Sequence, residues 1–118
     1  MQESKRQKQV GKLIQEELSQ IFLKESLTMM EGGMISIAEV SMTPDLLEAR
    51  IYLSFFQIKN EQQVLNIFQN KAAELRGILG NNLRHHLRRI PELQFFLDKT
   101  LDEVFRLEKI FKEIKKED

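Results

Sequence analysis

The chain has 118 residues, and its 18 Lys and Arg residues balance 18 Asp and Glu residues, so the formal net charge is zero. This length fits one domain, which we expect to span residues 1–118. The absence of Cys excludes disulfide scaffolds, thiolate metal sites and cysteine catalysis. No apolar run approaches the roughly 20 residues that span a membrane, and residues 1–12 are too polar for a signal peptide. We therefore expect a cytoplasmic protein with no membrane partner.

The first predicted element is an amphipathic helix from Ser4 to about Glu25. Its apolar residues recur at intervals of three and four, which is the spacing of one buried helix face. These residues are Val10, Leu13, Ile14, Leu18, Ile21 and Phe22. Ser4 followed by Gln7 three positions later has the pattern of a capping box, so the helix is expected to begin there.

Two strands are predicted after a loop that contains Gly32 and Gly33. Residues 35–42 are apolar on both faces and their alternation changes phase, which predicts a strand with a bulge. Residues 43–45 (TPD) have the chemistry of a turn. Residues 49–55 alternate between apolar and more polar side chains and therefore predict a half-buried strand.

The next predicted elements are helical. One helical stretch runs from about Glu61 to Gly80, and residues 80–82 are expected to interrupt it because Gly and Asn tolerate left-handed backbone angles. A short helix from Leu83 to about Ile90 follows, and Pro91 ends it.

A third strand at residues 93–98 and a final helix complete the predicted order. Thr100 and Glu103 form a second capping-box pattern, which opens a helix at about residues 101–116. The order is α-β-β-α-α-β plus a C-terminal helix, packed on the domain or extending from it. This order is typical of a small α+β domain, with a three-stranded sheet and helices packed on one face.

Five segments of the chain carry a family resemblance. They are residues 6–10 (RQKQV), 42–46 (MTPDL), 49–54 (ARIYLS), 75–80 (LRGILG) and 89–98 (RIPELQFFLD). Their order and spacing resemble the ribosome-binding factor A family of small bacterial ribosome-assembly factors. The resemblance implies a type II KH-like fold. It also implies non-catalytic binding to the free small (30S) ribosomal subunit and assistance in late maturation and processing of 16S rRNA.

Residues 77–80 (GILG) form a G-x-x-G string, which KH domains use to clamp a nucleic-acid backbone. Ile78 and Leu79 fit a buried helix face better than an exposed loop, so the string does not predict a clamp. The resemblance implies an Ala-x-Gly helix kink instead. Residues 71–74 (KAAE) lack the glycine of that motif, and the kink is therefore expected at Gly77 or Gly80.

The charges are segregated along the chain despite their zero sum. Residues 1–12 carry a net +3 and residues 69–89 a net +4, which the other segments cancel. On the predicted helix at residues 83–90 the basic side chains lie opposite the apolar ones, whereas His86 borders the core and is expected to be packed. These basic side chains form either a solvated polar face or a surface that binds RNA phosphates. The predicted rRNA contacts are Lys5, Arg6, Lys8, Lys12, Lys71, Arg76, Arg84, His85, Arg88 and Arg89.

The sequence contains no catalytic constellation. His85 and His86 would diverge by about 100° on a helix and cannot chelate one metal as an i, i+4 pair would. No phosphate-binding loop of the G-x-x-x-x-G-K-[ST] type is present. We expect a monomer without catalytic residues, metal, cofactor or small-molecule substrate, whose partners are the small ribosomal subunit and its 16S rRNA.

The sequence supports two further interpretations, each of which concerns a different surface. Tyr52 and Phe96 point away from the predicted core and either stack RNA bases or are covered by the C-terminal helix, which is the preferred interpretation. The alternative function is a protein-interaction module without direct RNA binding. Its surfaces would be the acidic middle segment, residues 28–68, and the Met-rich loop at residues 29–34.

Overall fold

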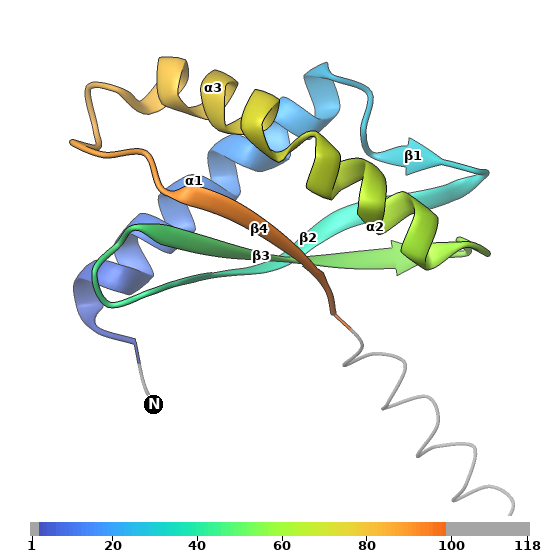
Figure 1. The fold of residues 1–118 in the computed structure, drawn as a ribbon, viewed down its shortest axis with the longest axis horizontal. Helices are drawn as coiled ribbons and strands as arrows, with labels where there is room; N and C mark the ends of the chain where they lie inside the picture. Colours follow the sequence, from blue (N-terminus) through green and yellow to red (C-terminus); the bar gives the residue numbers. More distant parts are fainter. Residues whose placement is uncertain (1–2, 99–118) are drawn as a thin grey trace, which may run out of the picture.

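The computed structural model describes residues 3–98 as helices packed on one face of a single sheet (Figure 1). The elements are α1 (Lys5–Lys24), β1 (Met29–Met30), β2 (Gly33–Met42), β3 (Glu48–Phe56), α2 (Glu61–Asn70), α3 (Ala72–Leu83) and β4 (Glu92–Leu97). The sheet order is β1-β2-β3-β4, with β3 and β4 parallel and the other pairs antiparallel. The predicted α+β class is confirmed. The final helix predicted at about residues 101–116 lies outside the described residues.

The sheet has four strands instead of the predicted three. The additional strand, β1, is only two residues long and pairs with the first two residues of β2. The predicted bulge is confirmed, because the register between β2 and β3 shifts between Ile37 and Glu39. The shift turns Val40 and Met42 towards the core, where both are buried.

The predicted start of α1 is confirmed by its cap. The Gln7 amide N–H donates to Ser4 Oγ at 3.2 Å, and the Ser4 amide N–H donates to Gln7 Oε1 at 2.7 Å. Gln7 is buried, and its Nε2 also donates to the carbonyl of Met42 at 2.8 Å. A Cβ at Gly11 would lie 3.0 Å from the carbonyl oxygen of Val40, so the glycine permits close approach of the helix. The capped end of α1 is therefore held against the end of β2.

The helical stretch after β3 breaks at Lys71. The prediction that the kink lies at Gly77 or Gly80 was therefore wrong. The amide N–H of Lys71 ends α2 by donating to the carbonyls of Ile67 and Phe68, and its own carbonyl begins α3. Residues 77–80 lie inside α3, so the G-x-x-G string forms no loop. Gly80 serves close packing instead, since a Cβ there would lie 3.2 Å from Ile90 Cγ1.

The prediction of a short helix at residues 83–90 was also wrong. After Leu83 the chain makes one turn, in which the amide N–H groups of His86 and Leu87 donate to the Leu83 carbonyl. The chain then folds back so that Ile90 packs on Gly80. A continuous helix would place residues 80 and 90 about 15 Å apart along its axis, so this contact excludes it. We name residues 84–91 the return loop.

The core lies between the helices and the sheet. Phe68 of α2 is at its centre, with ring centroids 5.1 Å from Phe22 of α1 and 5.7 Å from Phe95 of β4. All three side chains are buried, as are the inward-facing residues of β3, Ala49, Ile51 and Leu53. No helix within residues 3–98 combines the length and apolar character needed to cross a membrane.

Candidate nucleic-acid interface

Three segments far apart in the sequence meet at one end of the molecule. They are the first turns of α1, the turn between β2 and β3, and the return loop (Figure 1). Residues of all three line a hollow of about 500 Å³. Its lining consists of Arg6, Val10, Asp45, Leu46, Leu47, His86, Leu87, Arg88 and Arg89. We name it the basic hollow. Arg6 comes from the first basic segment and Arg88 and Arg89 from the second, so the fold brings the two segments together.

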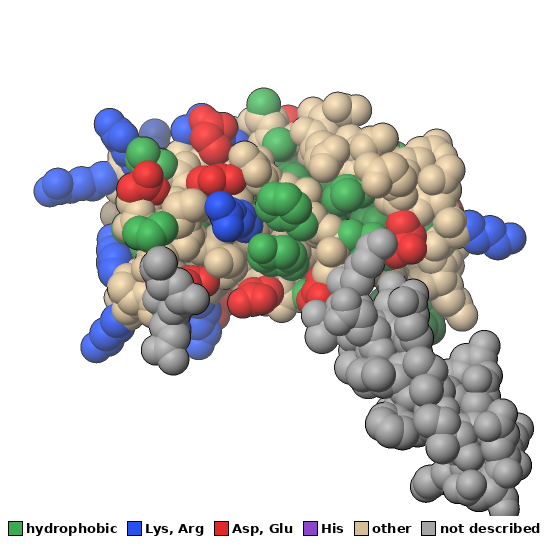
Figure 2. Space-filling view, turned by 60° about the horizontal axis from the view of Figure 1, so that its bottom comes forward, with side chains coloured by type: hydrophobic (Ala, Val, Ile, Leu, Met, Phe, Trp, Pro, Cys, Tyr) green, Lys and Arg blue, Asp and Glu red, His purple; other side chains and the backbone are tan. Residues whose placement is uncertain are grey.

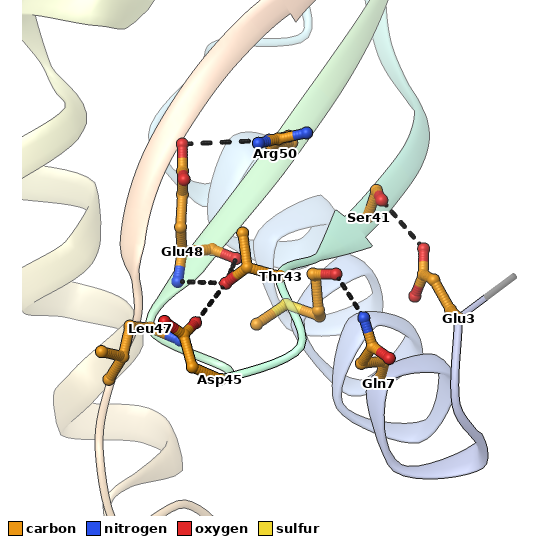
Figure 3. A network of polar contacts seen from close by, with 9 residues as sticks. Glu3, Gln7, Ser41, Thr43, Asp45, Leu47, Glu48 and Arg50 are labelled. Atoms are coloured by element: carbon orange, nitrogen blue, oxygen red, sulfur yellow. Dashed lines mark hydrogen bonds and ion pairs between the residues drawn. The ribbon is translucent and has the colours of Figure 1, made fainter. Parts of the chain in front are cut away.

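Hydrogen bonds hold the β2–β3 turn that forms one wall (Figure 3). The Thr43 hydroxyl donates to Asp45 Oδ1 at 2.6 Å, and the amide N–H of Leu47 donates to the same oxygen at 3.0 Å. These two bonds, chiefly that from Thr43, lower the pKa of Asp45, so its carboxylate stays ionised well into acid. The Leu47 carbonyl accepts from the amide N–H of Glu92 at 2.9 Å, which fastens the turn to β4.

The floor of the basic hollow is apolar. Val10 and Leu87 are buried in the core, whereas Leu47 is 43% exposed. Leu46 is partly buried and has a φ of 62°, a left-handed conformation that costs a leucine free energy. The turn thus presents two consecutive leucines beside the basic side chains.

The predicted rRNA-contact residues fall into two sets. Arg6, Arg88 and Arg89 line the basic hollow and are exposed. Lys5, Lys8 and Arg84 are exposed cations that lie near these residues in the sequence, and His85 is exposed beside Arg84. None of the cations in these two groups makes an ion pair with another residue in the described part of the chain. Each of them is therefore available to a polyanion.

The remaining predicted contacts lie apart or are engaged. Lys12 is exposed but lines a separate depression beside Glu16 on α1. Lys71 pairs with Glu74 at 3.8 Å, and the length of α3, about 18 Å at 1.5 Å per residue, separates it from Arg84, where the return loop begins. Arg76 is turned towards the return loop and bound there.

Arg76 holds the return loop in place. Its Nε donates to the carbonyl of Pro91 at 3.1 Å and its Nη2 to the carbonyl of Ile90 at 2.8 Å. An ion pair with Glu92 at 3.8 Å adds to these bonds. The return loop is not helical, so its carbonyls have no helical N–H partners. The Arg76 guanidinium donates to two of these carbonyls and thereby positions the loop.

Arg76→Ala should lower the free energy of unfolding by about 2 kcal/mol, because hydrogen bonds from a charged donor are lost and two carbonyls lose their partner. Urea unfolding followed by circular dichroism measures this change. Arg84→Ala, which removes an exposed arginine from the same region, is the matched control and should change the value by less than about 0.5 kcal/mol. Equal effects of the two substitutions would contradict the positioning role.

Sequence reasoning misplaced His86 and missed the apolar floor. His86 is exposed and lines the basic hollow, because the return loop is not the helix on which it would have bordered the core. Leu46 and Leu47 were not predicted as site residues. The available signal was the pair of apolar residues directly after a polar turn.

The outer face of the sheet carries a second surface feature. Tyr52 and Phe96 stack there at a centroid distance of 5.5 Å. Met34 lies opposite Phe56 in the register, and both are exposed, Phe56 to 61%. Figure 2 shows apolar side chains in the middle of the molecule and most of the visible Lys and Arg side chains at one end.

Comparison with known proteins shows the family to which the chain belongs. The sequence profile of one family, described as ribosome-binding factor A, matches residues 6–111. The chain belongs to the ribosome-binding factor A family. A ribosome-binding factor A from Cytophaga hutchinsonii is 39% identical over 119 residues, which cover 98% of this chain and 90% of the relative. A ribosome-binding factor A from Chlorobium phaeobacteroides is 37% identical over 113 residues, with 95% and 96% covered.

Solved structures of the ribosome-binding factor A family share the fold. A putative ribosome binding factor A from Thermotoga maritima has a TM-score of 0.65 at 22% identity, covering 85% of this chain and 93% of its own. The Thermus thermophilus crystal structure has a TM-score of 0.62 at 16% identity, covering 77% and 94%. A homology model of the Thermus thermophilus factor, fitted into a cryo-electron-microscopy map of its 30S complex, has a TM-score of 0.56 at 17% identity, covering 73% and 92%.

Proposed function

We propose that this chain binds the small ribosomal subunit through its 16S rRNA and assists late maturation of that RNA without catalysing a reaction. Membership of the ribosome-binding factor A family supports the ribosome as partner. The observation that carries the RNA contact is the meeting of both basic segments around one hollow. In this proposal the protein acts in the cytoplasm as a monomer.

The phosphate contacts would come from the unpaired cations at this end of the molecule. Arg6, Arg88 and Arg89 provide planar guanidinium groups, which suit phosphate oxygens because they donate two parallel hydrogen bonds. The N-terminus of α1 adds the positive end of a helix dipole to the same region. Such contacts set affinity and orientation but carry no sequence information, so the shape of the RNA would supply selectivity.

Salt dependence tests this electrostatic mechanism. Contact with about four phosphates should weaken binding to small subunits by roughly 50- to 150-fold between 50 and 200 mM salt, because bound counterions are released. Co-sedimentation of the purified protein with small subunits measures the affinity at each salt concentration. An affinity that stays constant across this range would contradict binding through phosphates.

A protein-binding function is the second candidate, and the exposed apolar residues Met29, Met34 and Phe56 favour it. Binding to protein-free 16S rRNA separates the two functions. Retained affinity for the bare RNA supports direct RNA contact. Loss of that affinity, with binding to intact subunits unchanged, would show that ribosomal proteins form the partner surface.

A further inference from the structure

The basic hollow differs from a simple phosphate site. Phosphate needs donors and positive charge alone, and exposed arginines on a helix would supply both. Here the arginines surround an apolar floor that includes the side chains of Val10, Leu46 and Leu87. Concave sites of about 300–1,000 Å³ with an apolar lining and few polar groups are typical of small-molecule recognition. The volume of about 500 Å³ falls in that range.

The charges around the basic hollow have two signs. Arg6, Arg88 and Arg89 are cationic, whereas Asp45 in the same lining is an ionised carboxylate. The hydrogen bonds from Thr43 and Leu47 both end on Oδ1 of this carboxylate (Figure 3). A carboxylate repels phosphate and attracts N–H donors. The complementary ligand therefore combines an anionic group, a flat apolar part and an N–H donor.

We propose that the basic hollow binds one unpaired nucleotide whose base carries an exocyclic amino group. The 5′-phosphate contacts the arginines and the base lies on Leu46 and Leu87. The amino group donates to Asp45, as cytosine N4 does to carboxylates in other nucleic-acid complexes. This site rests on the proposed function, because it assigns one nucleotide contact within the proposed RNA interface. A nucleotide inside a duplex is excluded, since both faces of its base are stacked on its neighbours and neither can lie on Leu46 and Leu87.

Cytidine and uridine 5′-monophosphates provide the sharpest probes, because the exocyclic group is an amino donor in one and a carbonyl acceptor in the other. We expect the amide signals of residues 45–47 and 86–89 to shift in NMR titrations of the full chain with cytidine monophosphate. Affinity should be about fivefold weaker for the uridine nucleotide, which lacks the hydrogen bond to Asp45. Inorganic phosphate should bind more weakly than either nucleotide, since it cannot use the apolar floor.

Two variants test the walls of the basic hollow. Asp45→Asn keeps the turn, because asparagine forms the same side-chain bonds to the following backbone, and it should abolish the preference for cytidine over uridine. Leu46→Gly removes part of the floor at a φ of 62°, where glycine is unstrained. It should bring the affinity for both nucleotides close to that for inorganic phosphate. Gln57→Gly is the matched control, since Gln57 has a φ of 58° at the opposite end of β3.

Equal affinity for inorganic phosphate and the two nucleotides would overturn the nucleotide site, as would normal nucleotide affinity in a folded Leu46→Gly variant. Should Leu46→Gly fail to fold, the Asp45→Asn titration decides alone. Either negative result leaves binding to 16S rRNA intact, and co-sedimentation with small subunits would still be salt-dependent. Failure of the proposed function has the opposite pattern, because the subunits would then not bind in a salt-dependent manner at all.

Discussion

Reversing two charges of the basic hollow, with Arg6→Glu and Arg88→Glu in one chain, should lower the affinity for small ribosomal subunits by about a hundredfold at 100 mM salt. The two residues belong to different basic segments but line the same hollow. Each substitution removes a phosphate donor and places a repelling carboxylate there. Both side chains are exposed, so the free energy of unfolding should change by less than about 1 kcal/mol.

The matched control is Lys24→Glu with Lys59→Glu, which changes the net charge by the same amount. Lys24 ends α1 and Lys59 follows β3, so both lie far from the capped end of α1 and from the β2–β3 turn. Co-sedimentation at one salt concentration compares the pairs. Similar losses in the two double variants would show that binding follows total charge, and the basic hollow would lose its special role.

Phe68→Ala should lower the free energy of unfolding by about 4 kcal/mol, because a fully buried aromatic ring is lost and a cavity remains. The effect is large because Phe68 contacts both Phe22 and Phe95 and so connects α1, α2 and β4. Urea unfolding measures the loss, and a variant of this stability would be close to unfolding at 37 °C.

Phe56→Ala provides the control for this substitution. The same atoms are removed from a side chain that is 61% exposed, so the change should stay below about 1 kcal/mol. A loss at Phe68 no greater than that at Phe56 would mean that the three rings do not form the centre of the core.

The elements predictable from the sequence were those with clear local signals. The capping box at Ser4 and Gln7 placed the start of α1, and the phase change in residues 35–42 placed the bulge. The break at Lys71 had no such signal. The apolar residues 64, 68, 72, 75 and 79 keep helical spacing across it, and neither proline nor glycine marks it.

In the return loop, by contrast, a local helical signal is present but misleading. Leu83, Leu87 and Ile90 have helical spacing, but Ile90 is placed by a contact with Gly80 and by the bonds that Arg76 makes. Both are tertiary interactions, which outweigh local propensity. The two basic segments could be predicted from charge alone. Their meeting could not, because it depends on how α1, the β2–β3 turn and the return loop pack.

The basic hollow is assembled from residues 6–10, 45–47 and 86–89, so it exists only when the parallel pair of β3 and β4 has formed. A partly folded chain has the same cations but no hollow. Any ligand specific for the hollow therefore binds the native state alone and stabilises it by mass action, by about 2.7 kcal/mol at a free concentration of one hundred times its Kd. Occupancy of this site and completeness of folding are thermodynamically linked, and a shift in Tm on adding RNA would report both.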